Sequence, residues 1–303
     1  MNEYSKKMLK VPTYNLLREQ DMGKLPVLDV RNLGIDLGAV MLAVMLTAIL
    51  WSTWSFAALL VAITAGVTWE HLRLSEHCGA QPQKVMAMTM AVLVVVPFAL
   101  VHTVVGDVEW WILLMTFFIM IATLAVLFVE LFRASETPIQ NVGATLLPLF
   151  QVALPIGMLA LLPAIGVGYN AWRVVAFFSI IWANDVFAFL VGITLGRHRL
   201  CERISPKKSW EGFFGGIVAA MGVALLAAHL LGENMYVWAG LGLISALAAV
   251  AGDLIESMFK RAAGVKDSGA IMPGHGGWFD RFDAVLTAAP VAIIYLIIFM
   301  HNL

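Results

Sequence analysis

Long apolar stretches alternate with short polar ones along almost the whole chain. Each apolar run is close to the length of about 20 residues that an α-helix needs to cross the hydrocarbon core of a bilayer. The first two are short and are joined by WSTWS (51–55), so their boundaries are the least sharply defined. The pattern predicts an all-α, polytopic helical membrane protein with about nine transmembrane helices. The nine runs are 35–51, 55–70, 85–105, 110–131, 144–163, 173–195, 211–231, 235–256 and 284–302.

Composition agrees with this class. The 303 residues are 61% hydrophobic and only 13% charged, whereas roughly a quarter of the residues of a soluble domain are charged. A soluble globule is therefore excluded. The net charge of −1 says nothing about partners. Cys78 and Cys201 both lie in segments expected to face the cytoplasm, so we expect no disulfide.

The positive charges define an orientation. Only Arg173 of the 19 Lys and Arg residues lies outside alternate polar segments of the chain. Because such residues concentrate on the cytoplasmic side, we expect a cytoplasmic N-terminus. Residues 1–34 should be a cytoplasmic arm and not a signal peptide, and residues 35–303 a single integral membrane domain. The segments that carry the charges are 1–34, 71–84, 132–143, 196–210 and 257–283.

Polar residues of the second half gather near its expected cytoplasmic face. Asp185 lies inside an apolar run, where a carboxylate is costly and usually faces a polar cavity or a partner. A hydrogen bond to Asn184 is the simpler alternative. Lys207 and Lys208 precede the seventh run, where they could bind a ligand or act only as a topology signal. Ser205 or Ser209 could cap the following helix.

Residues 251–283 hold the densest group of charges. Asp253, Ser257 and Lys260 are spaced i, i+4 and i+7 and so share one face of a helix. Asp280 and Asp283 are spaced i and i+3 at the start of the last helix. Between these pairs the chain passes through a glycine-rich loop whose backbone can approach a ligand closely.

This mixture of acids and bases suggests a particular chemistry. Carboxylates without many His or Cys residues suit a hard cation such as Mg²⁺. Lys and Arg beside them suit a polyphosphate. Plain ion pairing would explain one or two pairs, but not so many charges around a flexible GHGG. The residues therefore predict a phosphate-and-metal site, in which His275 is either structural or a phosphate contact. The charges concerned are Asp253, Asp280, Asp283, Lys260, Arg261, Lys266 and Arg281.

The block SMFKRAAGVKDSGAIMPGHGGWFDRFD (257–283) resembles the signature of phosphatidate cytidylyltransferases, also called CDP-diacylglycerol synthases. That signature joins S-x-x-K-R, K-D and H-G-G-x-x-D-R-x-D at fixed spacing. The resemblance covers roughly residues 172–300, the expected catalytic half. It implies that CTP and phosphatidic acid react to give CDP-diacylglycerol and pyrophosphate.

The resemblance also implies roles for individual residues. The metal set would be Asp253 and Asp280, with Asp283 beside them. Phosphate-handling catalytic residues would be Ser257, Lys260, Arg261, Lys266 and His275. Substrate-binding residues would be Lys207, Lys208, Ser205, Asp185 and Arg281.

Cofactor and partners follow from the same resemblance. We expect Mg²⁺, with a second, monovalent cation left open, together with CTP, phosphatidic acid and membrane lipids. A homodimer in a bacterial inner membrane is expected, with the active site facing the cytoplasm and no nucleic-acid partner.

Other classes of membrane protein could also carry this group of charges, but their motifs differ. A CDP-alcohol phosphotransferase should carry D-G-x-x-A-R…G…D…D, which is missing from the sequence. A polyprenol-phosphate sugar transferase would not predict the HGG-x-x-D-R spacing. An ion-coupled transporter would usually show repeat-related halves. The polar residues of this chain gather instead in its second half, which argues against a transporter. A related enzyme acting on a different lipid phosphate remains open, because lipid tails are recognised by shape.

Overall fold

The computed structural model describes residues 30–100, 108–166, 168–269 and 276–300, and these are almost entirely helical. The helices are α2 (Val30–Trp51), α3 (Thr53–His77), α4 (Lys84–Leu100), α5 (Val108–Arg133), α6 (Pro138–Pro148), η2 (Leu149–Ala153), α7 (Leu154–Leu159), η3 (Leu162–Ala164), α8 (Trp172–Leu195), α9 (Trp210–Leu231), α10 (Met235–Ala262) and α11 (Phe279–Met300). Two short strands, β1 (Arg199–Cys201) and β2 (Ser205–Ser209), pair in antiparallel fashion between α8 and α9. Side chains of α2 and α5 are described from residues 38 and 113 onward.

In the described part of the chain, each predicted apolar run coincides with a helical segment. Within the described ranges, seven helices are long and apolar enough to cross a membrane, and Gly38–Trp51 and Lys84–Leu100 are shorter apolar helices. The prediction of a polytopic helical membrane protein is confirmed.

The fifth span is irregular. It runs from Pro138 to Ala164, longer than the predicted 144–163, and contains the π-helical turn η2 between α6 and α7. Pro155 lies in the first turn after η2 and has no N–H to donate to the helix. Such π turns inside helices commonly mark functional positions. Here the turn directs Gln151 toward His71, and the two side chains are 3.0 Å apart.

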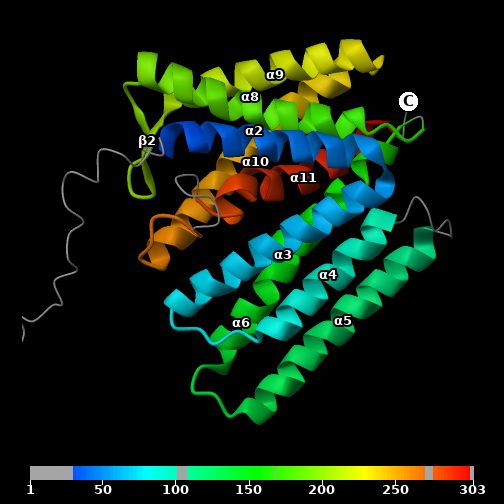
Figure 1. Ribbon diagram of the computed structural model, residues 1–303, viewed down its shortest axis with the longest axis vertical. Coiled ribbons are helices and arrows are strands. Elements are labelled where there is room, and N and C mark those ends of the chain that lie inside the picture. Colours follow the sequence, from blue (N-terminus) through cyan, green and yellow to red (C-terminus); the bar gives the residue numbers. More distant parts are fainter. Residues whose placement is uncertain (1–29, 101–107, 167, 270–275, 301–303) are drawn as a thin grey trace, which may run out of the picture.

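Helices α8 to α11 form the closely packed second half, with α8 and α9 side by side in Figure 1. Small residues allow this approach. A Cβ atom on Gly216 of α9 would lie 2.6 Å from the Oδ1 of Asn184 on α8, so no larger residue fits there without displacement. Helices α3 to α6 form a second group, with α5 at its outer edge (Figure 1).

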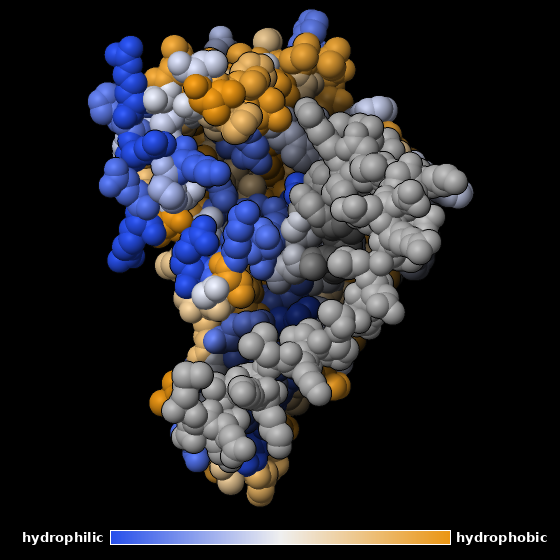
Figure 2. Space-filling view, turned by 60° about the vertical axis from the view of Figure 1, so that its left-hand side comes forward, coloured by the Kyte–Doolittle hydropathy of each residue, from blue (hydrophilic) through white to orange (hydrophobic). Residues whose placement is uncertain are grey.

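The polar connections gather at one end of the bundle, on the left of Figure 1. Hydrogen bonds join two of them, since Arg133 Nη1 donates to Gln81 O at 2.9 Å and Gln140 Nε2 donates to Cys78 O at 2.9 Å. These connections belong to the positively charged segments of the sequence. Figure 2, which brings this end forward, shows hydrophilic surface gathered there and hydrophobic surface above it.

Arg173, the exception in the charge pattern, has a structural explanation. Its buried guanidinium lies 2.7 Å from Glu233 Oε1 and also donates to the carbonyl oxygens of Pro163 and Gly168. The cation therefore joins the start of α8 to the turn between α9 and α10.

We predict that Arg173→Met lowers the free energy of unfolding by about 3–5 kcal/mol, because it leaves a half-buried carboxylate without its partner. Equilibrium unfolding in mixed micelles would measure this, with the exposed Arg203→Met as control. The double variant Arg173→Met/Glu233→Leu should regain much of the loss. Equal stability of Arg173→Met and Arg203→Met would contradict the structural role.

Candidate functional site

Three carboxylates from two helices meet at the polar end of the bundle. Asp253 and Glu256 come from α10 and Asp283 from α11, and one potential ligand atom of each lies within 4.8 Å of the others. Glu256 is 1% exposed, and its Oε1 has no hydrogen-bond partner among the described residues. A buried, unpartnered oxygen in an all-oxygen donor set fits a hard divalent cation such as Mg²⁺. We call these three residues the acidic cluster.

Asp280, which the sequence assigns to the metal, lies outside this group of three in the structure. Its Oδ1 accepts from Lys260 Nζ at 2.6 Å, and its Oδ2 lies 2.8–3.0 Å from Ser268 N, Ser268 Oγ and Gly277 N. Gly276, with φ +77°, supplies the backbone turn that brings the Gly277 amide to this carboxylate. Both oxygens of Asp280 are thus engaged by protein groups, whereas Glu256 is the third carboxylate that lies close to Asp253 and Asp283.

Two lysines border the acidic cluster. Lys260 Nζ lies 2.6 Å from both Glu256 Oε2 and Asp280 Oδ1, and Lys208 of β2 forms an ion pair with Asp253. Burial lowers the pKa of the Lys208 ammonium below its usual range, against the opposing effect of Asp185, Asp283 and Glu256. The positive charges partly offset the repulsion among the carboxylates.

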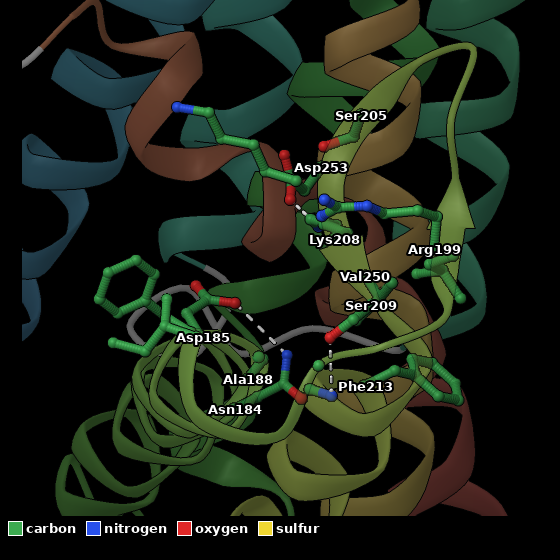
Figure 3. A pocket seen from close by; sticks show the side chains of 17 residues that line it. Asn184, Asp185, Ala188, Arg199, Ser205, Lys208, Ser209, Phe213, Val250 and Asp253 are labelled. Atoms are coloured by element: carbon green, nitrogen blue, oxygen red, sulfur yellow. Dashed lines mark hydrogen bonds and ion pairs between the residues drawn. The ribbon is translucent and has the colours of Figure 1, made fainter.

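A cavity of about 650 Å³ opens beside Asp253, bounded by α8, the β1–β2 hairpin, α9 and α10. Its volume lies within the usual range for small-molecule sites. In Figure 3, Lys208 and Asp253 face one another at the cavity, with Asp185 and its partner Asn184 across from them. The polar side chains that line it are Asn184, Asp185, Arg199, Ser205, Lys207, Lys208, Ser209 and Asp253.

The hairpin that carries these cations was not predicted. The sequence predicts only a polar cytoplasmic segment over 196–210, but β1 and β2 form within it and Arg199 lies in the wall of the cavity. Ser209 is the cap of α9, since its Oγ accepts from Gly212 N at 3.2 Å. The hairpin is fastened to α9 by Glu211, which accepts from the backbone of residues 197 and 198 and pairs with the ring of His198 at 2.7 Å.

A second cavity, of about 320 Å³, lies between α2, α8 and α11. Met41, Leu42 and Met45 give it an apolar wall, while Asp280, Arg281 and Asp283 border its polar side. Asp185 lines both cavities. The acidic cluster therefore stands between them, with Asp253 at the first and Asp283 at the second.

The other predicted residues are placed as follows. Ser257 is buried on α10, whereas Arg261 and Lys266 are exposed near the end of that helix. His275 lies outside the described residues.

Glu70 of α3 was missed. It is 1% exposed, and its Oε2 accepts from Ser268 Oγ at 2.8 Å and from Phe279 N at 2.9 Å. In the sequence it is the last residue of an apolar run, where its charge cannot be told apart from the charges of the polar loop that follows. Its contacts connect the first half of the chain to the loop before α11.

Comparison with known proteins finds similarity to cytidylyltransferases. The model of the cytidylyltransferase family matches residues 35–299. The chain is 48% identical over 122 residues to a phosphatidate cytidylyltransferase of Staphylococcus aureus (strain COL), which covers 40% of this chain and 47% of that protein. It is 44% identical over 124 residues to the phosphatidate cytidylyltransferase of Mycobacterium leprae (strain TN), covering 41% of this chain and 40% of that protein. The alignments thus span less than half of these relatives.

The acidic cluster predicts a ranking of variants in cation binding. Glu256→Gln and Asp253→Asn should weaken binding of Mn²⁺, used as a probe, more than Asp280→Asn does, because Asp280 is held by protein donors. Calorimetric titration of purified protein would measure this, with the exposed Glu136→Gln as control. A larger loss for Asp280→Asn than for Glu256→Gln would restore Asp280 to the metal set.

Proposed function

Because this chain belongs to the cytidylyltransferase family, we propose that it transfers a cytidylyl group from CTP to phosphatidic acid. An oxygen of the lipid phosphate attacks the α-phosphorus of CTP. The bond from that phosphorus to the oxygen bridging to the β-phosphate breaks, and pyrophosphate leaves. The single observation that carries the proposal is an acidic cluster that borders two cavities, one with Arg199, Lys207 and Lys208 in its wall and the other with an apolar wall from α2 beside charged residues of α11.

The larger cavity is the proposed nucleotide site. Arg199, Lys207 and Lys208 line it and would neutralise the triphosphate, while Ser205 offers a hydroxyl. Phosphoryl-type transfers depend mainly on positioning and charge neutralisation, and not on covalent help from the protein. The attacking lipid oxygen is already ionised near neutral pH, so the site needs no strong general base.

The acidic cluster is the proposed magnesium site, with Glu256 joining Asp253 and Asp283 in place of Asp280. A divalent cation held by these carboxylates would neutralise phosphate charge during the transfer. Asp280 instead orients Lys260, whose ammonium is aimed at the same cluster. A second, monovalent cation remains an expectation from the family resemblance.

The smaller cavity is the proposed site of the lipid head group. Its apolar wall on α2 suits the start of the acyl chains, and Arg281 at its polar side suits the phosphate. Asp185, shared by both cavities, would separate the two substrates before reaction. A lipid phosphate other than phosphatidic acid would meet the same polar groups, so this remains the alternative substrate.

The proposed orientation places the site at the cytoplasmic side of a bacterial inner membrane. The site lies at the end of the bundle that carries the positive segments, and CTP is cytosolic. The relatives named above are bacterial. The homodimer remains an expectation.

A turnover assay tests the proposed reaction. Purified protein in lipid–detergent micelles, given labelled CTP, phosphatidic acid and Mg²⁺, should transfer label to lipid. EDTA and Asp253→Asn should abolish transfer while folded protein is retained. If no label is transferred to phosphatidic acid although CTP binds, the substrate is another lipid phosphate. If no label is transferred and CTP does not bind, the reaction class is contradicted.

The lipid cavity generates a separate prediction. Leu42→Trp should fill part of it and lower kcat/KM for phosphatidic acid roughly tenfold, equivalent to about 1.4 kcal/mol, while the KM for CTP stays unchanged. Leu50→Trp, on the same helix but outside the lining, is the matched control. An equal change in kcat/KM for phosphatidic acid in both variants, or a change in the KM for CTP alone, would show that this cavity does not bind the lipid.

A further inference from the structure

Glu70 begins a continuous series of contacts that ends at the acidic cluster. Its Oε2 lies 2.8 Å from Ser268 Oγ, and the same hydroxyl lies 2.8 Å from Asp280 Oδ2. Asp280 Oδ1 then holds Lys260 Nζ at 2.6 Å, and Lys260 Nζ holds Glu256 Oε2 at 2.6 Å. Four contacts thus connect α3 to a member of the acidic cluster.

Two glycines, Gly269 and Gly277, pack directly against the Glu70 carboxylate. A Cβ atom on Gly269 would lie 2.6 Å from the carboxyl carbon of Glu70, and one on Gly277 would lie 2.5 Å from it. Both glycines therefore allow the loop to close around the carboxylate. Glu70 also accepts from Phe279 N, the first residue of α11, and so fixes where that helix begins.

The same face of α3 supports the loop at a second point. Gly66, one helical turn before Glu70, receives the Trp278 indole, and a Cβ atom there would lie 2.6 Å from Trp278 Cγ. Phe279, next along the chain, packs against His71 with ring centroids 5.7 Å apart. Helix α3 thus forms a docking face for residues 276–279.

We propose that Glu70 is a positioning residue, which fixes Ser268 and the start of α11 so that Asp280 and Lys260 hold Glu256 in the acidic cluster. The inference rests on the proposed function for its consequence in catalysis. The geometry alone predicts an effect on cation binding. Direct partners of metal ligands typically change metal affinity or activity 10- to 100-fold when they are removed. Glu70 lies three contacts beyond Lys260, the direct partner of Glu256, so we expect an effect no larger than the lower end of that range.

The test measures Mn²⁺ binding to the full-length protein in micelles, without CTP or lipid. Glu70→Ala should weaken binding by up to roughly tenfold, the lower end of the range for direct partners of metal ligands. Glu70→Gln should remain close to the unmodified protein, because its amide oxygen can accept from both Ser268 and Phe279. Glu76→Ala is the matched control, since Glu76 lies on the same helix but is exposed and paired with Lys84.

A double variant tests the route. If Glu70 acts through Ser268, the loss in Glu70→Ala/Ser268→Ala should match the larger single loss, whereas independent effects would multiply. Thermal unfolding of each variant, with binding normalised to folded protein, separates a positioning role from general destabilisation.

The outcomes distinguish this inference from the proposed reaction. Weak Mn²⁺ binding in Glu70→Ala, with rescue in Glu70→Gln, supports the positioning role even if the unmodified protein transfers no cytidylyl group. Equal Mn²⁺ binding in Glu70→Ala and Glu76→Ala overturns it, even if transfer occurs. Multiplying losses in the double variant overturn the route through Ser268.

Discussion

Repulsion among three carboxylates at the polar end of an apolar bundle is the constraint on which the site depends. Asp253, Glu256 and Asp283 bring potential ligand atoms within 4.8 Å of one another, in surroundings where charge is poorly screened by water. Such a group is stabilised by positive charge held among the carboxylates or by a proton bound to one of them. Lys208 and Lys260 supply part of it, and a divalent cation would supply the rest.

The other elements of the second half of the chain position these charged residues. Helix α10 carries two of the acids and Lys260 on one face, while the hairpin after α8 brings Lys208 across to Asp253. Asp253 lines one cavity, together with Arg199, Lys207 and Lys208, and Asp283 lines the other, together with apolar residues of α2. In the proposed reaction, a water-soluble nucleotide and a lipid would reach the same group of oxygens through different cavities. The first half contributes support, through α3 and the loop before α11.

Much of this could be predicted from the sequence, and the failures have physical causes. Apolar runs define the spans because a bilayer demands a fixed helix length. The spacing of Asp253 and Lys260 places them on one face of a helix in any fold. Whether Asp280 or Glu256 joins the cluster depends on which carboxylate the loop amides occupy, and that requires the folded loop. Glu70 is 198 residues from Ser268 along the chain, so no local pattern reveals their contact. The position of Arg199 in the cavity wall could not be predicted, because its hairpin is too short to show the alternation of polar and apolar residues that marks a strand.

The position of a bound cation tests the central claim most directly. Crystals grown with Mn²⁺ and a non-hydrolysable CTP analogue would give an anomalous-scattering peak that locates the metal independently of the protein chain. We predict one peak among the side-chain oxygens of Asp253, Glu256 and Asp283, on the side of the cavity lined by Lys208. A peak centred on Asp280, or one remote from α10 and α11, would contradict the account.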